Sequence, residues 1–472
     1  MISRRATAAD EKKPCWNSPS SARYRITTMT LSFRTYQPAA DGITPDTARF
    51  QQALDDLDAQ GGGTLVVESG RYLLGGLRLP SNCCLQLDEG AELIASACYD
   101  DFAHTTTLSV AELSNRAFLY ARQQRNITLC GKGKITGSAD AYFSAQPDEQ
   151  GYRLPAQHRP RIVVLEDCEQ ITIQDITIEH APMWTVHLVS CRQVNVERLT
   201  VDNDMTMANT DALNLDSCQD VIIHDCHLSA ADDALCIKTT AKPPAMQYKA
   251  QRMTVSHCRL RSRSCALKIG TETFADIEDL NVSHCTLYDS NRGIGLISRD
   301  GGAFRRICFS DITVECITAP PCHWGKADPI FISVRYRDPT IEPGVIEQVR
   351  FVRITGVSEG AINLHSTPAG YVRDIHFEDI TLTQQPADST EQGLYDVRPP
   401  CNPARPTGMG LDNAYLVNPD TGRAYGVEAY PGGMPALFAR GINGLTWHNM
   451  TLQRPSPLPV SWNRDAIIEL AE

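Results

Sequence analysis

The sequence ITIQDITI at residues 171–178 is one copy of an eight-residue unit that recurs along much of the chain. Further copies begin at residues 194, 221, 253, 280, 307, 349, 375 and 445. Apolar and polar residues alternate within each copy, which is typical of a β-strand with one buried face. Strands that recur at intervals of about 20–50 residues with no helices between them predict a right-handed parallel β-helix, because each coil buries its inward side chains on the next.

Second strands lie between these copies, for example ALNLDS, ALCIKT, ALKIGT and GIGLIS, so each coil is expected to contribute to at least two sheets. The alternative is a β-propeller or a β-sandwich, but a propeller blade needs about 40–45 residues, which is longer than most of these units. The strand pattern places one set of aliphatic side chains inside the coil, namely Leu213, Leu215, Leu235, Ile237, Leu267, Ile269, Ile294 and Leu296.

Residues 44–60 are predicted to form one helix, which would cap the N-terminal end of the solenoid. Thr44 is suited to the N-cap and Pro45 to the first turn. Four apolar residues fall on one face of this helix: Phe50, Ala53, Leu54 and Leu57. The glycines at positions 61–63 would end it.

We expect a single all-β domain over residues 29–472, preceded by a polar, disordered tail over residues 1–28. Two insertions, near residues 320–328 and 384–432, interrupt the repeat. Insertions of this kind usually project over one face of a repeat protein, where they wall a binding groove.

The net charge of −12 disfavours nucleic acid and anionic membrane surfaces as partners. The chain has no apolar stretch of 18 residues and no apolar core of a signal peptide near its start, so neither a membrane span nor secretion is expected.

The seventeen cysteines are odd in number, and many lie inside apolar runs. Buried free cysteine behaves as a small hydrophobic residue, so we predict reduced thiols in a cytoplasmic protein. No CxxC pair is present, and neither a metal nor a cofactor is expected.

Three carboxylates stand out in the stretch 209–238, NTDALNLDSCQDVIIHDCHLSAADDALCIK: Asp211, Asp232 and Asp233. Each precedes an apolar alternating run, and residues 211 and 232 are one coil apart in the predicted fold. Neighbouring coils lie about 4.8 Å apart, so the three acids would crowd together. Crowded carboxyls tend to divide into protonated and ionised forms, as acid–base cleavage of a glycosidic bond requires. The alternative is a pair of structural Asx turns.

The motifs NTDALNLDS and ADDALCIK resemble glycoside hydrolase family 28, the polygalacturonase and rhamnogalacturonase family. The likeness runs from about Phe33 to Asp465 and includes GKGKITG at residues 131–137. It implies a pectin lyase-like right-handed β-helix and an inverting hydrolase. Carried over to this sequence, it makes Asp232 the general acid, while Asp211 and Asp233 hold and deprotonate the attacking water.

Two family motifs are changed, which identifies the chain as an atypical member. Cys265 stands where the family usually has the histidine of a Gly-His-Gly motif. Gly295 and Ile297 stand where it usually has the arginine and lysine of an Arg-Ile-Lys motif, which grips a uronate carboxylate.

Strand parity predicts that Lys238, Lys268 and Arg299 point outward on three successive coils, beside the acids. Such a column of cations would bind a substrate carboxylate. The alternative is that the two lysines pair with Asp216 in a solvated ladder of little energetic value.

Further candidates for substrate binding are Asn209, Trp184, His187 and Trp324. Trp184 would stack on a sugar ring, unless it is an ordinary half-buried surface aromatic. His187 is more often a structural residue. Trp324 lies in the insertion near residues 320–328, which would close one end of the groove and make the enzyme exo-acting.

Three functions follow from these residues. The favoured one is an inverting, exo-acting glycosidase that cleaves pectin-derived, galacturonate-containing oligosaccharides. The second is a uronate lyase of the same fold, which would use Ca²⁺ and take Lys238 or Lys268 as its base. The third is a non-catalytic β-helix that binds glycans. The sequence does not indicate an oligomeric state.

Overall fold

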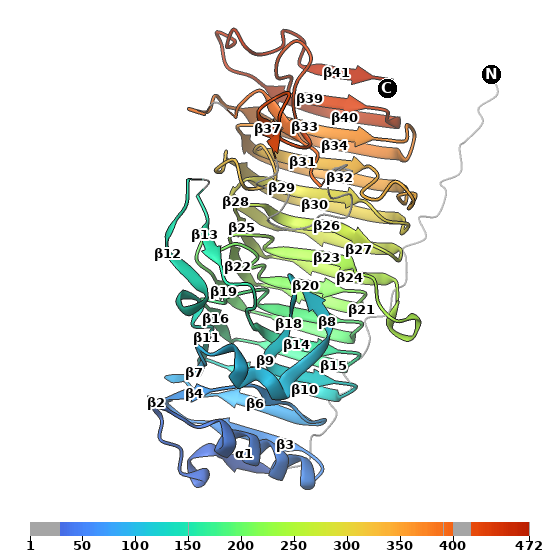
Figure 1. Cartoon of the computed structure of the whole chain (residues 1–472). Coiled ribbons are helices and arrows are strands. Elements are labelled where there is room, and N and C mark those ends of the chain that lie inside the picture. The colour runs from blue at the N-terminus through green and yellow to red at the C-terminus, as the bar shows by residue number, and fades with distance from the viewer. Residues whose placement is uncertain (1–28, 150, 390, 400–416, 472) are drawn as a thin grey trace, which may run out of the picture.

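The computed structural model describes residues 29–149, 151–389, 391–399 and 417–471, which form a right-handed parallel β-helix (Figure 1). The predicted tail over residues 1–28 lies outside the described residues. The described coils have three faces. One face is a sheet of parallel strands: β5 (Leu77–Arg78), β9 (Ser114–Arg122), β14 (Arg161–Glu166), β17 (Val186–Val189), β20 (Leu213–Asp216), β23 (Leu235–Thr239), β26 (Cys265–Thr273), β29 (Arg292–Ser298), β31 (Asp328–Val334), β33 (Ile362–Ser366), β39 (Leu437–Arg440) and β41 (Ile467–Leu470).

The other two faces belong to a second, 22-stranded sheet. One of them contains β1 (Thr30–Ser32), β3 (Gly63–Val67), β6 (Cys83–Leu87), β10 (Arg125–Gly131), β15 (Glu169–Gln174), β18 (Arg192–Glu197), β21 (Gln219–His224), β24 (Ala250–Ser256) and β27 (Ile277–Ser283). The other contains β2 (Asp41–Pro45), β4 (Gly70–Leu74), β7 (Ala91–Ala95), β11 (Lys134–Thr136), β16 (Thr177–Glu179), β19 (Thr200–Asp202), β22 (His227–Ala230), β25 (Arg259–Ser262) and β28 (Thr286–Ser290). Long strands span both faces in the later coils: β30 (Phe304–Cys316), β32 (Ile346–Ser358), β34 (Val372–Gln384) and β40 (Asn443–Gln453).

The sequence pattern predicted one straight strand for each eight-residue unit, but the chain turns within the unit. Its fifth residue adopts a left-handed conformation, with φ between 49° and 60°, and turns the chain from one face to the next. These corner residues are Asp175, Arg198, Asp225, His257, His284, Asp311, Arg353, Asp379 and Asn449. Most are Asp, Asn or His, the non-glycine residues that tolerate this region best. The sequence carries the signal, because apolar residues occupy positions 1, 3, 6 and 8 of the unit.

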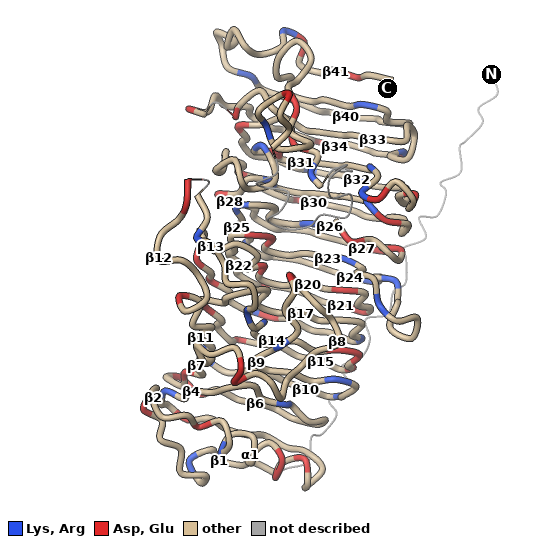
Figure 2. Tube along the Cα trace, viewed as in Figure 1, with Lys and Arg blue, Asp and Glu red and all other residues tan. Residues whose placement is uncertain are grey.

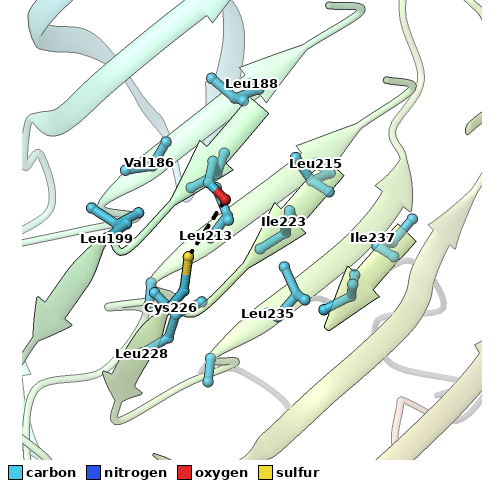
Figure 3. Packing of buried hydrophobic residues seen from close by; sticks show 14 of the residues in the cluster. Val186, Leu188, Leu199, Leu213, Leu215, Ile223, Cys226, Leu228, Leu235 and Ile237 are labelled. Atoms are coloured by element: carbon cyan, nitrogen blue, oxygen red, sulfur yellow. Dashed lines mark hydrogen bonds between the residues drawn. The ribbon is translucent and has the colours of Figure 1, made fainter. Parts of the chain in front are cut away.

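The predicted inward side chains form the core. Leu213, Leu235 and Leu267 lie in register on successive coils and are fully buried. Figure 3 shows Val186, Leu213 and Leu235 stacked in this way, beside the parallel column of Leu188, Leu215 and Ile237. All eight predicted residues belong to one continuous hydrophobic cluster, so this part of the prediction is confirmed.

The N-terminal helix is shorter than predicted. α1 runs over Thr47–Ala59 and covers the N-terminal end of the solenoid (Figure 1). Thr44 and Pro45 belong to β2 instead, and the cap position is Asp46. The Asp46 carboxylate accepts hydrogen bonds from the backbone amides of residues 39 and 40, which fold the preceding segment back over the helix. The four predicted apolar residues are buried against the first coils.

Several segments leave the coils. β8 (Thr106–Ala111) forms an antiparallel hairpin with β9, and β12 (Phe143–Pro147) forms one with β13 (Arg153–Pro155). The predicted insertion near residues 320–328 lies in the loop between β30 and β31. Part of the predicted insertion at residues 384–432 is outside the described residues; its described part includes β35 (Leu394–Asp396), β36 (Val417–Asn418), β37 (Arg423–Ala424) and β38 (Val427–Ala429).

Acidic and basic residues are interspersed along the length of the solenoid (Figure 2). Among the described residues, no helix has the length and apolar composition that crossing a membrane would require.

Candidate functional site

The three acids lie where the chain turns from the second sheet back to the first, at the same corner of successive coils. The backbone amide of Thr185 donates to the carbonyl of Asp211 at 2.8 Å, and that of Ala212 donates to the carbonyl of Asp233 at 3.0 Å. Asp211 and Asp233 therefore occupy equivalent positions, each two residues before a leucine of the in-register pair Leu213 and Leu235.

This register differs by one residue from the expected pairing of residues 211 and 232. Because Asp211 and Asp233 align, both are held in the wall of the coil and are 2% and 1% exposed. Asp232 precedes the aligned position and is only partly buried. The acid predicted to donate a proton is thus the most accessible of the three.

These acids line one pocket. Eight of the ten predicted site residues line it: Trp184, Asn209, Asp211, Asp232, Asp233, Lys238, Lys268 and Trp324. The other lining residues were not predicted as site residues: Glu112, Tyr152, Ser264, Thr271, Glu272 and Cys322. Among the described residues, no group of three or more His, Cys, Asp or Glu side chains is arranged to hold a metal ion.

The three carboxyl groups have different electrostatic surroundings. Burial and the neighbouring Asp233 raise the pKa of Asp232 to about 7, as a general acid requires. Burial, Asp232 and Asp233 also raise the pKa of Asp211 well above its usual range, which departs from the expectation that Asp211 is ionised in the free enzyme. Asp233 instead has a cationic partner, because Lys268 Nζ lies 2.6 Å from its Oδ2.

Among the three acids, two buried carboxylate oxygens are left without a hydrogen bond from the described residues, Asp211 Oδ1 and Asp233 Oδ1. Both are buried acceptors on neighbouring coils, and a buried acceptor is costly unless a donor reaches it. A water molecule or a sugar hydroxyl group would satisfy them. The arrangement can therefore hold a nucleophilic water between two carboxylates.

Lys238 and Lys268 both line the pocket, but neither pairs with Asp216. Lys238 Nζ lies 3.6 Å from Glu272 Oε2 and 3.9 Å from the centroid of the Trp184 ring. Asp216 is bound by Lys242 and by the backbone amide of Thr240. The solvated ladder considered above is therefore absent from the described site, where both lysines are at least nine-tenths buried.

Glu272 was not predicted, and its sequence neighbourhood gives no clear signal. The register of β23 and β26 shifts between Ile237 and Thr239, so Thr239 pairs with Thr273. This irregularity brings Glu272 beside Lys238, four residues beyond Lys268, and strand alternation alone does not reveal it.

Arg159 is a second residue that was missed, and it positions Asn209. Its guanidinium donates to Asn209 Oδ1 at 2.9 Å and to the backbone carbonyls of Pro182 and Ala208. Arg159 is itself 3% exposed. It belongs to the RPRIV segment at residues 159–163, but the sequence does not predict to which loop a buried arginine will donate its hydrogen bonds.

His187 lies beneath the pocket rather than in its lining. Its ring contacts Trp184 edge-on, with centroids 4.9 Å apart, and its Nδ1 lies 2.7 Å from Arg161 Nη1. Burial lowers the pKa of His187 to about 4, so the imidazole is neutral. This residue supports the tryptophan and does not reach the pocket surface.

Arg299 does not join the column of cations. It is fully buried, and its guanidinium donates to the backbone carbonyls of Ser333, Val397 and Pro399. Its role in the structure is to hold the segment that follows β35 against the solenoid. The alternation of side chains along a strand does not predict the direction of Arg299, because β29 ends at Ser298.

Two insertions meet at one side of the pocket. Tyr152 Oη from the β12–β13 hairpin lies 2.8 Å from His323 Nδ1 of the loop between β30 and β31, and their rings pack 4.3 Å apart. The next residue of that loop, Trp324, lines the pocket, and Asp396 accepts a hydrogen bond from the amide of Gly325 at 2.7 Å. Both the insertion and the hairpin therefore contribute lining residues to the pocket, and the contribution of the hairpin was not predicted.

Comparison with known proteins adds four findings, which concern a family model, one relative and two solved structures. The model of a family described as glycosyl hydrolases family 28 matches residues 67–397. A probable polygalacturonase from Vitis vinifera is 24% identical over 364 residues, covering 69% of this chain and 72% of that protein.

Among solved structures, a family 28 exopolygalacturonase from Yersinia enterocolitica superposes with a TM-score of 0.69 at 15% identity, covering 94% of this chain and 78% of that one. A hyperthermoactive exopolygalacturonase from Thermotoga maritima superposes with a TM-score of 0.64 at 20% identity, covering 75% and 87%. At these identities the two structures support the fold.

Proposed function

Because the chain belongs to glycoside hydrolase family 28 and is therefore a glycosidase, we propose that it is an inverting, exo-acting hydrolase of pectin-derived, galacturonate-containing oligosaccharides. The observation that carries this proposal is the meeting of Asp211, Asp232 and Asp233 in one pocket, at a corner shared by successive coils. The polygalacturonases among its relatives and neighbours support the choice of substrate.

In the proposed mechanism, Asp232 donates its proton to the glycosidic oxygen as the bond to the leaving sugar breaks. Its raised pKa keeps it protonated up to about neutral pH, and its partial exposure lets it reach the substrate. Asp211 and Asp233 bind the attacking water through their unpaired Oδ1 atoms. Lys268 stabilises the charge on Asp233, so this carboxylate accepts the proton of the water.

The exo-acting mode is supported by the wall that Tyr152, His323 and Trp324 build at one side of the pocket. A wall formed by two insertions that contact each other leaves less room for a continuing polymer than an open groove does. We propose that Trp184, Asn209, Lys238, Lys268 and Trp324 contact the terminal sugar or the sugar after the scissile bond.

The alternative of a uronate lyase is disfavoured by the two candidate bases. A lysine that acts as a base needs a lowered pKa. Burial alone would lower the pKa of both lysines, but Cys236 and Glu272 raise the pKa of Lys238, and Asp233 and Cys236 raise that of Lys268. The non-catalytic alternative leaves the raised pKa of Asp232 without a role.

The decisive experiment is an assay on defined galacturonides and rhamnogalacturonan fragments, with products identified by chromatography and the anomer of the first product identified by NMR. We expect single sugars to be released from the non-reducing end with inversion. Absorbance at about 235 nm from an unsaturated product would point to a lyase, and binding without any cleavage would point to a glycan-binding protein.

We also propose that the protein functions in the cytoplasm. Support comes from the fifteen cysteines that the structure describes, most of which are buried and none of which forms a disulfide with another described cysteine. Cys15 and Cys401 lie outside the described residues. Abundant reduced cysteine is typical of a reducing compartment.

A further inference from the structure

Carboxyl groups outnumber cations in the lining of the pocket. Within the described lining there are two lysines and no arginine, against five carboxyl groups: Glu112, Asp211, Asp232, Asp233 and Glu272. A further carboxylate brought in by a sugar would therefore lie among carboxyl groups, in a partly buried site where screening is weak.

Both lysines are also engaged already. Lys268 is paired with Asp233 at 2.6 Å, and Lys238 lies 3.6 Å from Glu272 and against the Trp184 ring. A substrate carboxylate could bind either ammonium only in competition with a carboxylate of the protein. The third predicted cation, Arg299, is bound to backbone carbonyls away from the pocket.

The hydrogen-bonding groups of the pocket also favour a neutral sugar over a uronic acid. Three buried carboxylate oxygens in its lining accept no hydrogen bond from the described residues: Asp211 Oδ1, Asp233 Oδ1 and Glu272 Oε2. An ionised carboxylate is an acceptor only, so it cannot satisfy them, whereas each hydroxyl group of a neutral sugar can donate. Because Asp211 Oδ1 and Asp233 Oδ1 hold the attacking water in the proposed mechanism, Glu272 Oε2 is the acceptor left for a hydroxyl group of the sugar.

Glu272 is the group whose negative charge is fixed most firmly. Burial opposes its ionisation, but Lys238, Arg337 and Lys268 outweigh this effect and lower its pKa to about 2. It is not one of the three acids of the proposed mechanism, so its charge is available for recognition. It is placed both to accept a hydroxyl hydrogen bond and to repel a carboxylate.

We propose that the sugar bound in this pocket, on the glycone side of the scissile bond, is a neutral sugar that carries no carboxylate, and that Glu272 selects it. This inference rests on the proposed function and narrows it. The enzyme would remove a neutral terminal sugar from a galacturonate-containing oligosaccharide, while the galacturonate lies beyond the bond that is cleaved.

The test compares aryl glycosides that differ in the group at C6, such as galactosides and galacturonides, together with rhamnosides, arabinosides and xylosides. We expect the highest kcat/KM for a neutral glycoside. A galacturonide cleaved faster than every neutral glycoside overturns the proposal. The Glu272→Gln variant keeps the size of the side chain but removes its charge, and should reduce the preference for neutral over uronic substrates by about tenfold.

The matched control is Glu89→Gln, which removes a charge at an exposed turn outside the pocket and should leave the preference unchanged. A preference that is unaltered in Glu272→Gln as well contradicts the role given to Glu272. If this variant fails to fold, the comparison of substrates with the unaltered enzyme still decides between neutral and uronic sugars.

Failure of the proposed function gives a different result. If no glycoside of either kind is cleaved, the hydrolase mechanism is wrong, and binding of free galactose, rhamnose and galacturonate, followed by NMR, then tests the inference alone. Tighter binding of galacturonate than of every neutral sugar, or no binding of any neutral sugar, overturns it.

Discussion

Lys268 Nζ lies 2.6 Å from Asp233 Oδ2, and both side chains are almost fully buried. The two residues come from successive coils, β26 and the turn before β23. Cys265 lies on the same coil as Lys268, aligned with Asp233, and burial raises the pKa of its thiol to about 12. A neutral thiol cannot stabilise a carboxylate as a cation can. Lys268 is therefore the positioning residue that provides Asp233 with a cationic partner, on the coil where the usual histidine of the family is replaced by Cys265.

Replacing Lys268 with methionine removes the ammonium group that lies 2.6 Å from Asp233 Oδ2 and leaves this buried carboxylate without its cationic partner. Catalysis should weaken most at acidic pH, so the acidic limb of the kcat profile should move upward. We expect kcat near pH 6 to fall by roughly 10²-fold, the lower end of what general-base catalysis contributes. Lys268→Arg should restore part of the activity, and Lys249→Met, at a surface ion pair, serves as the control. An unshifted profile would show that Lys268 does not act through Asp233.

The three acids should respond differently to an activated substrate. Asp211→Asn, Asp232→Asn and Asp233→Asn should each lower kcat on a natural oligosaccharide by roughly 10²–10⁴-fold. An aryl glycoside with a good leaving group needs little proton donation, so it should rescue Asp232→Asn alone. Rescue of Asp233→Asn instead would show that Asp233, and not Asp232, is the general acid. Full activity in all three variants would show that the three acids have only a structural role.

The raised pKa of Asp232 also predicts how its replacement affects stability. In the unfolded chain this carboxyl ionises near 3.8, but in the folded protein it does so only at about 7. Its contribution to folding is therefore complete below pH 3.8 and is lost as the pH rises toward 7. The Tm of Asp232→Asn relative to the unaltered protein should be higher at pH 8 than at pH 4. Thermal unfolding at both pH values measures this, and a difference that does not depend on pH contradicts it.

Arg299 should matter for stability rather than for substrate binding. Arg299→Met would leave the buried carbonyls of Ser333, Val397 and Pro399 without their donor, which should cost about 3 kcal/mol or more of unfolding free energy. Arg306→Met, at an exposed ion pair, should cost about 1 kcal/mol or less. Denaturant unfolding gives both values. A variant of normal stability with a raised KM would restore the substrate-binding role first given to Arg299.

The cytoplasmic proposal predicts the outcome of thiol titration under denaturing, non-reducing conditions. Most of the seventeen cysteines should react, because none of the fifteen described ones forms a disulfide with another described cysteine. Protein purified without added reductant from its natural source is the proper sample. A count near zero would show that the cysteines pair after synthesis and would contradict the proposed location.

The sequence by itself determined the architecture and the identity of the acids. Side chains that point into a coil must be apolar at a fixed period, so the positions of Leu213, Leu235 and Leu267 could be read directly from the repeat. The motifs around Asp211 and Asp232 are local, and their spacing of about one coil was enough to bring them together.

Tertiary structure decided what depends on register and on insertions. The alignment of Asp211 with Asp233, rather than Asp232, arises from backbone pairing between coils, and it determines which acid is accessible. The place of Glu272 beside Lys238 follows from a strand irregularity, and the burial of Arg299 follows from a segment nearly a hundred residues later in the chain. Such contacts are set by packing between distant parts of the chain. The periodicity of a sequence predicts which face of the coil a residue occupies, but it does not predict which residues from other parts of the chain will contact it.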